Sequence, residues 1–421
     1  MFVAIDNTPR DYAWGSRSAI AAYRGRPASG EPEAELWLGA HAGSPARIVD
    51  GASVGHADLA EWIAADPVAA LGPDLASKGA RLPFLLKVLA AGAPLSLQAH
   101  PTPEQARAGF ALEEADGVPI DAYDRNYKDE FHKPELIVAV SETFDALSGF
   151  RPMEEVRGVL AALRAADEAS DSPEPGAIEL LESHLSGAEP LRATVEWLLT
   201  DGRGGDTGEA SWVIERVTAL AASPEAAASP YAVSFETVGA LAEAYPGDPG
   251  IVISLLLNRV RLTAGESLYL AAGNIHAYLD GLGIELMAAS DNVLRGGLTP
   301  KHVDVDELAR VLDFTPMPPP RLEPVEVAPG VRAFRPGVPD FQLYRVEPST
   351  AGEAVRVALG GPAIVVAERA RIELRGGAST EPFMLERGEA AFVTPEEREL
   401  VVAGDGDAWI ATVDGSWSPA A

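Results

Sequence analysis

The spacing of apolar residues changes twice along the chain, and these changes limit how it can fold. Up to about residue 150, short apolar stretches such as ELWLGA (35–40) and ELIVAV (135–140) are broken by glycine, proline and aspartate, which is typical of strands. From about 151 to 250, apolar residues recur at helical spacing, and beyond 250 the strand pattern returns. The sequence therefore predicts one β domain that is interrupted by a helical insertion.

The helical pattern is clearest at the start of the insertion. Val156, Val159, Leu160 and Leu163 follow the i, i+3, i+4, i+7 spacing that puts side chains on one face of a helix. After the insertion, SLYL (267–270), IHAYL (275–279) and GIELMA (283–288) are short apolar segments with turn-like residues between them. We expect them to be three separate strands.

A proline-rich stretch, PMPPPRLEP (316–324), predicts a stiff linker. Beyond it, segments such as AIVVAER and AWIATV recur between turn residues, which favours a small all-β sandwich or barrel. The predicted domains are a β domain formed by residues 1–150 and 251–318, a helical domain at 151–250, and a C-terminal β domain at 325–421.

Charge and cysteine content narrow the possible partners. The 421 residues include 33 basic and 63 acidic side chains, and the net charge of −30 argues against nucleic acid or an anionic membrane as a partner. An anionic ligand would need a local concentration of lysine and arginine. The chain has no cysteine, so disulfides and thiolate metal sites are excluded. No signal peptide or membrane span is evident, and we expect a cytoplasmic protein that is a monomer.

Three segments carry candidate metal ligands. In LSLQAHP, Gln98 and His100 lie two residues apart, so a strand would point both to one face. FHKPELIVAV offers Glu135 next to an apolar run, with Lys133 before it, and GNIHAYLDGLG places His276 at a strand start. Two imidazoles, a carboxylate and an amide oxygen suit zinc or another divalent metal, and the net positive centre would stabilise an oxyanion. In the alternative interpretation, Gln98 caps a turn and Glu135 pairs with Lys133.

A fourth segment, GIELMAASDNVLRGGLTPKHVD, concentrates charged residues around two glycines. It contains Glu285, Asp291, Arg295 and Lys301, and the glycines permit close approach of a ligand to the backbone. Neither a phosphate-binding Walker loop nor a strand-linked GxGxxG is present, so nucleotide binding gains no support. The segment could equally be a charged turn before a helix that is capped near Asp304.

Taken together, these motifs resemble type I mannose-6-phosphate isomerases, the type I phosphomannose isomerase family. The resemblance runs in the family's order over residues 11–304 and rests on DYAWGS, EAELWLGAH, LSLQAHP, HKPELI, FDALSGFRP, GNIHAYLDG and SDNVLRGGLTPKHVDV. It implies a cupin-type β-sandwich (jelly roll) that holds one zinc ion, a helical domain, and a second cupin-like domain at the C-terminus. The C-terminal region resembles the family only in architecture.

The resemblance also implies roles for individual residues. The zinc ligands would be Gln98, His100, Glu135 and His276. Arg295 corresponds to the family's proposed catalytic arginine, and pocket-lining lysines correspond to Lys133, Lys301 and Lys87. Two departures from the family pattern are Phe131, where an asparagine is usual, and Gly296, where an alanine is common.

The implied reaction interconverts mannose 6-phosphate and fructose 6-phosphate through a cis-enediol, with a small sugar phosphate as partner. It needs a group that moves a proton between C2 and C1, and Glu285 and Asp291 are the acidic candidates, although either could instead orient a neighbouring lysine or arginine. Two alternatives are an iron-dependent cupin oxygenase and a non-catalytic sugar-binding cupin. Gln98 as a fourth ligand argues against the first, and the basic segment around Arg295 and Lys301 argues against both.

Overall fold

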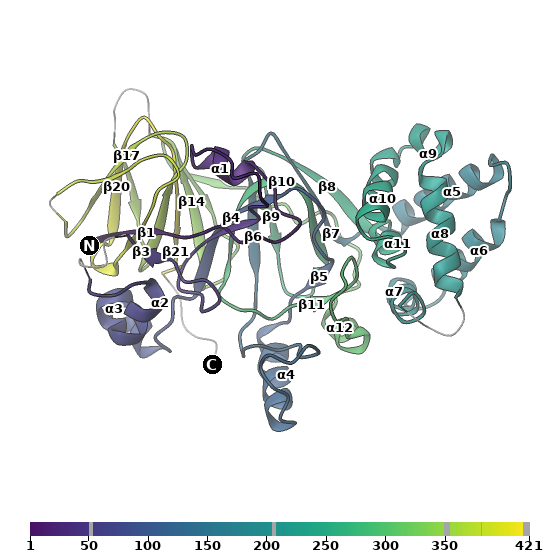
Figure 1. Ribbon diagram of the computed structural model, residues 1–421, viewed down its shortest axis with the longest axis horizontal. Helices are drawn as coiled ribbons and strands as arrows, with labels where there is room; N and C mark the ends of the chain where they lie inside the picture. The colour runs from purple at the N-terminus through teal and green to yellow at the C-terminus, as the bar shows by residue number, and fades with distance from the viewer. Residues whose placement is uncertain (50–53, 204–207, 349–353, 380, 416–421) are drawn as a thin grey trace.

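The computed structural model describes residues 1–49, 54–203, 208–348, 354–379 and 381–415. The chain forms successive layers along its long axis, with the C-terminal sheets at one end, a central β-sandwich, and a bundle of helices at the other end (Figure 1). The predicted fold class, mainly β with a helical insertion, is confirmed.

The central β-sandwich is a nine-stranded sheet folded into two layers that share its longest strand, β10 (His276–Ala288). The last part of β10 pairs with one layer and its first part with the other. The first layer contains β2 (Glu35–Leu38), β4 (Phe84–Ala91), β6 (Glu135–Ala139) and β9 (Ser267–Leu270). The second contains β5 (Gln98–Ala99), β7 (Thr143–Phe150), β8 (Leu257–Thr263) and β11 (Leu294–Arg295).

β10 corrects the expectation of two strands at 275–279 and 283–288. The glycines between them permit close packing within one strand instead of a turn. Gly281 has φ of 123°, and a Cβ there would lie 2.8 Å from the ring of Phe144 on β7. The pairing of β10 with β7 also shifts register between Tyr278 and Asp280. A glycine-containing irregularity of this kind bends a strand without ending it, and it lets β10 pass from one layer to the other.

The C-terminal β region is a sandwich of an eight-stranded and a four-stranded sheet. In sheet order, the eight strands are β12 (Val325–Ala328), β13 (Val331–Phe334), β14 (Gln342–Val346), β21 (Ala408–Thr412), β16 (Ala363–Ala367), β19 (Ala390–Val393), β1 (Phe2–Asp6) and β3 (Arg47–Ile48). The four are β15 (Val355–Ala358), β20 (Glu399–Gly404), β17 (Ile372–Gly376) and β18 (Phe383–Leu385).

Both faces of the middle of the eight-stranded sheet are buried. On β16, Val365 packs into the core shared with the four-stranded sheet, whereas Ile364 points to the core shared with the central sandwich. All five residues of β16 are buried, which explains its unbroken apolar sequence. The two β regions therefore share one continuous core.

The first strand of the chain belongs to the C-terminal sheet, although the sequence placed residues 1–150 in the other β domain. β1 pairs with β19, with Phe2 opposite Val393, and its other edge pairs with β3. The N-terminus accordingly lies among the C-terminal strands (Figure 1). Pairing between residues so distant in the sequence leaves no mark on local apolar spacing.

The helical insertion packs against the outer side of the second layer of the sandwich (Figure 1). Its helices are α5 (Met153–Glu168), α6 (Pro175–His184), α7 (Pro190–Asp201), α8 (Glu209–Ala221), α9 (Pro224–Ala228), α10 (Ala232–Ala244) and α11 (Gly250–Ser254). Val156, Val159, Leu160 and Leu163 are all buried on α5, as their spacing predicted. No helix in the described parts of the chain is long and apolar enough to cross a membrane.

The remaining helices lie outside the helical insertion, around the two β regions. They are α1 (Ala19–Tyr23), α2 (Leu59–Ala65), α3 (Pro67–Ser77), α4 (Pro103–Ala115), α12 (Val305–Val311) and the 3-10 helix η2 (Pro395–Glu397). Asp304 caps α12, because its side chain accepts a hydrogen bond from the backbone N–H of Glu307. The proline-rich segment 316–324 does not hang free, since the N–H of Tyr269 on β9 donates to the carbonyl of Pro320.

Candidate active site

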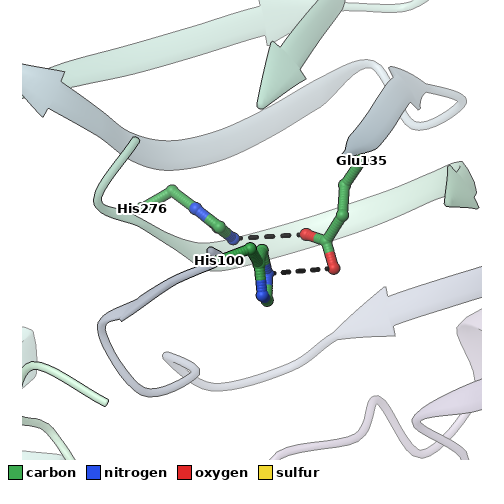
Figure 2. Close-up of side chains that lie close together, drawn as sticks. All are labelled: His100, Glu135 and His276. Carbon is green, nitrogen blue, oxygen red and sulfur yellow. Dashed lines mark ion pairs between the residues drawn. The ribbon is translucent and has the colours of Figure 1, made fainter. Parts of the chain in front are cut away.

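Three buried side chains from three strands meet inside the central sandwich. His100 directly follows β5, Glu135 begins β6, and His276 begins β10, and at most 1% of any of the three residues is exposed. One oxygen of Glu135 lies 3.2 Å from Nε2 of His100, and its other oxygen lies 3.2 Å from Nε2 of His276 (Figure 2). Among the described residues this is the one group of three or more histidine or acidic side chains close enough to hold a metal ion.

Hydrogen bonds to the backbone place a proton on Nδ1 of both imidazoles. Nδ1 of His100 lies 2.7 Å from the carbonyl of Asn292, and Nδ1 of His276 lies 3.0 Å from the carbonyl of Asn274. A carbonyl only accepts, so both Nδ1 atoms carry the hydrogen and donate it. Burial lowers the pKa of His100 to about 4, so this ring is neutral near pH 7 and its Nε2 presents a lone pair.

This arrangement fits a cation. Nε2 of His100 and one oxygen of Glu135 are buried and have no hydrogen-bond partner among the described residues. Lone pairs that face one another in a buried site repel, and burying an unsatisfied polar atom is costly. A divalent metal ion between them would bind all three groups, and nitrogen and oxygen donors without thiolate suit zinc and similar metals.

Gln98 lies at the edge of the same group. Its Cα is in register with His276 on one side and with Arg295 on the other, so the three side chains share a face of the sheet. The side-chain amide lies 3.3 Å from Nε2 of His276 and does not cap a turn. A 180° rotation of the amide exchanges its nitrogen and oxygen, so an oxygen ligand can point to the same place.

Lys133 contributes a positive charge next to the carboxylate. Its Nζ lies 3.2 Å from an oxygen of Glu135, and only 8% of the residue is exposed. Burial alone would raise the pKa of Glu135, but His100 and Lys133 outweigh it and hold that pKa well below its usual range. The pairing of Glu135 with Lys133 therefore exists, and it uses the oxygen that also faces His100, while the second oxygen of Glu135 faces His276.

Lys87 and Glu285 form a second buried charge cluster. Nζ of Lys87 on β4 lies 2.8 Å from Glu285 on β10 and 3.4 Å from Glu35 on β2. Burial would lower the pKa of Lys87, but the two carboxylates raise it above its usual value. Burial raises the pKa of Glu285, and Lys87 partly opposes this. Glu285 thus forms a buried ion pair with Lys87.

Glu35 was missed in the sequence. Its other oxygen accepts a hydrogen bond from Nε1 of Trp37, two residues along β2, at 2.9 Å. The signal was present, because a glutamate that alternates with a tryptophan in an apolar strand points to the same buried face. The sequence alone could not show the partner of Glu35, because that depends on the pairing of β2 with the strand that carries Lys87.

Asp291 is placed differently from Glu285. Its carboxylate is half exposed and lies 3.1 Å from Nε2 of His41, a residue that sequence reasoning also missed. Burial would raise the pKa of Asp291, but the hydrogen bond from His41 and nearby positive charges lower it, so the group is ionised near pH 7. Its N–H donates to Asp129, which fixes the backbone beside Asn292 and hence the carbonyl that holds His100.

Arg295 and Lys301 are the remaining predicted residues. Burial lowers the pKa of Arg295, and partial burial together with Arg295 lowers that of Lys301, so the two cations are close enough to repel. Neither side chain makes an ion pair or hydrogen bond with another described residue. The structure therefore leaves two uncompensated cations near one another, of which Arg295 lies beside Gln98.

Comparisons with known proteins show to which family the chain belongs. A family model for the phosphomannose isomerase type I catalytic domain matches residues 2–153. The mannose-6-phosphate isomerase of Escherichia coli (strain K12) is 36% identical over 402 residues, which cover 95% of this chain and 96% of that protein. The corresponding protein of Shigella flexneri is 35% identical with the same coverage.

Solved structures extend the similarity to three dimensions. A zinc-bound crystal structure of mannose 6-phosphate isomerase matches with a TM-score of 0.84 and 33% identity, and the match covers 98% of this chain and 99% of that one. A second structure of such an isomerase, bound with zinc and yttrium, matches with a TM-score of 0.82 and 32% identity over the same shares.

Proposed function

Because the chain belongs to the type I phosphomannose isomerase family, we propose that it interconverts mannose 6-phosphate and fructose 6-phosphate with one bound zinc ion. The observation that carries the proposal is the buried meeting of Nε2 of His100 and Nε2 of His276 with the carboxylate of Glu135, where Nε2 of His100 and one carboxylate oxygen have no hydrogen-bond partner among the described residues. His100, His276 and Glu135 would hold the ion, with the amide oxygen of Gln98 as the fourth ligand. When bound, zinc supplies a Lewis acid beside the substrate oxygens.

The reaction moves a proton from C2 to C1 through a cis-enediolate, on which negative charge grows at O1 and O2. Lys133, held 3.2 Å from Glu135, places a cation next to the site of that charge. Arg295 projects from the same face as Gln98 and is free of carboxylate partners. We assign Arg295 to the enediolate or the phosphate, and Lys301 to the phosphate.

The surroundings of the two acidic candidates favour different roles. Glu285 is buried, and its carboxylate is bonded to Lys87 at 2.8 Å, which suits a group that orients that lysine for substrate binding. Asp291 is half exposed and ionised, and it is held by His41, which suits a group that accepts a proton from substrate. Asp291 is therefore our candidate for proton transfer.

A coupled assay tests the proposal. Purified protein should convert mannose 6-phosphate to fructose 6-phosphate, lose activity on treatment with a chelator, and recover it on addition of zinc. An inactive protein with a full complement of zinc would contradict the isomerase proposal and favour a non-catalytic cupin. Iron in the purified protein together with oxygen consumption would favour the oxygenase.

Arg295→Ala separates catalysis from metal binding. We expect turnover to fall about 100- to 1,000-fold, as is typical when a group that stabilises an oxyanion is removed, with zinc content unchanged. Arg157→Ala is the matched control, because Arg157 is exposed on α5 in the helical insertion. Near-normal turnover in Arg295→Ala would refute the assigned role.

A further inference from the structure

One carboxylate of the helical insertion binds the loop that carries both uncompensated cations. This cation loop, residues 295–301, begins with Arg295 on β11 and ends with Lys301 before α12. Asp248 lies in the turn between α10 and α11, and its side chain is 12% exposed. The two segments are distant in sequence, and the contact brings an element of the insertion to the proposed active site.

Asp248 accepts hydrogen bonds from backbone groups of both segments. Its Oδ1 accepts from the N–H of Leu298 at 2.7 Å and from the N–H of Gly250 at 2.7 Å. Its Oδ2 lies 3.4 Å from the N–H of Thr299 and 3.4 Å from Nη1 of Arg203. Arg203 also donates to the carbonyls of Thr299 and Lys301, at 3.3 Å each.

The backbone that Asp248 holds is in a conformation that needs support. Leu298 has φ of 53° and Gly297 has φ of 117°, and a leucine rarely adopts the left-handed region. The two segments also pack closely at two glycines, and a Cβ on Gly297 would lie 3.1 Å from the backbone of Gly250. A Cβ on Gly297 would lie 2.9 Å from Oδ1 of Asp248, and a Cβ on Gly250 would lie 2.7 Å from the side chain of Leu298.

The other side of the cation loop is bound to the strand that carries candidate metal ligands. The N–H of Gly296 donates to the carbonyl of Leu97 at 2.8 Å, and the N–H of Leu97 donates to the carbonyl of Gly297 at 3.1 Å. Leu97 directly precedes Gln98. The cation loop is therefore fixed between the metal-binding strand and Asp248.

We propose that Asp248 is a positioning residue that holds the cation loop, so that Arg295 and Lys301 meet the phosphate of the substrate. The proposal rests on the function proposed above and gives the helical insertion a part in substrate binding. Without the carboxylate, the left-handed turn at Leu298 loses the hydrogen bond that its N–H donates to Asp248, and Arg295 and Lys301 on either side of the turn lose their fixed positions. We therefore expect phosphate to bind more weakly. Zinc binding should be unchanged, because the metal ligands lie on the other side of the cation loop.

The test compares Asp248→Ala and Asp248→Asn in the zinc-loaded, full-length protein. Asparagine keeps an oxygen that accepts from Leu298 and Gly250, whereas alanine removes it. We expect Asp248→Ala to raise the KM for mannose 6-phosphate and the inhibition constant of inorganic phosphate about 10- to 100-fold, since displacing a positioning group by about 1 Å can cost that much. Asp248→Asn should stay within about threefold of wild type, and zinc content should be unchanged in both variants.

Asp171→Ala, which removes an exposed aspartate from another turn of the insertion, is the matched control. A second readout is hydrogen exchange at the cation loop, which should become faster in Asp248→Ala and not in the control. If Asp248→Ala does not fold, Arg203→Ala serves in its place, because it removes the bonds to Thr299 and Lys301.

The outcomes separate this inference from the proposed function. An active wild-type enzyme whose KM and phosphate inhibition are unchanged in Asp248→Ala overturns the role of Asp248 alone. Loss of zinc also overturns it, because the defect would then lie at the metal ligands. Inactive wild-type protein would instead overturn the proposed function, whatever the exchange measurement shows.

Discussion

Asp340 belongs to the C-terminal β region, and its replacement with alanine should weaken catalysis in the central sandwich. Asp340 lies between β13 and β14, is 5% exposed, and has an oxygen 2.9 Å from Nε2 of His132. His132 immediately precedes Lys133, whose Nζ contacts Glu135. The same segment is fixed at Phe131, where the guanidinium of Arg81 lies 3.5 Å from the ring centroid.

The size of the effect follows from the strength of this hydrogen bond. A carboxylate can only accept, so Nε2 of His132 donates to it, and a hydrogen bond to a charged group contributes about 1.5–3 kcal/mol. If all of this energy holds Lys133 and Glu135 in place, its loss lowers kcat/KM by roughly 10- to 150-fold. Asp340→Asn keeps an acceptor and should cost only about 2- to 30-fold, because a neutral bond still contributes about 1 kcal/mol and the loss is then about 0.5–2 kcal/mol.

The assay measures kcat/KM for mannose 6-phosphate, together with zinc content, for wild type and both variants. Asp405→Ala removes an exposed acid from the turn between β20 and β21 and serves as the matched control. If Asp340→Ala keeps kcat/KM within about twofold of wild type, the bond to His132 does not position the site, and the reasoning from its strength fails.

Three further predictions concern the metal, the pH dependence and the packing. Asn292→Ala should weaken zinc binding about 10- to 100-fold, as measured by competition with a chelating dye. The side chain of Asn292 anchors the loop whose backbone carbonyl accepts the hydrogen bond from His100. An unchanged zinc affinity would refute this reasoning. Burial of Asp145 would raise its pKa, but hydrogen bonds from two arginines hold that pKa well below the usual value. The ionised carboxylate therefore stabilises the folded protein above the unfolded pKa of about 3.9, and this stabilisation is lost as the pH falls. The deficit in melting temperature of Asp145→Asn should therefore be largest near neutral pH and shrink below about pH 4, and a constant deficit would contradict this sign. Leu163→Ala, in the fully buried core of the insertion, should cost about 2–5 kcal/mol in urea unfolding, and a loss below about 1 kcal/mol would contradict its packing.

Local patterns predicted much of the fold because burial follows periodicity. The helical spacing from Val156 to Leu163 corresponds to the buried face of α5, and the apolar run at 363–367 corresponds to a strand buried on both faces. The predictions that were wrong concern contacts between residues that are distant in the sequence. β1 pairs with β19 near the other end of the chain, and Gly281 serves close packing within one long strand instead of a turn.

The sequence likewise predicted some residues of the candidate site and not others. Gln98, His100, Glu135 and His276 could be singled out because polar residues in apolar strands are conspicuous, and the structure brings them together. Their hydrogen-bond partners could not be found, because backbone carbonyls that fix the imidazoles have no sequence signature. Glu35 and His41 were missed because their meaning depends on Lys87 and Asp291, which are remote in sequence.

The coordination of the ion tests the central claim most directly. A crystal structure of the zinc-loaded protein, with anomalous scattering measured at the zinc edge, should show one zinc per chain among Gln98, His100, Glu135 and His276. The account predicts ligation through Nε2 of both histidines, while each Nδ1 keeps its bond to the carbonyl of Asn292 or Asn274. Zinc bound elsewhere, or ligation through Nδ1 with these bonds broken, would contradict it.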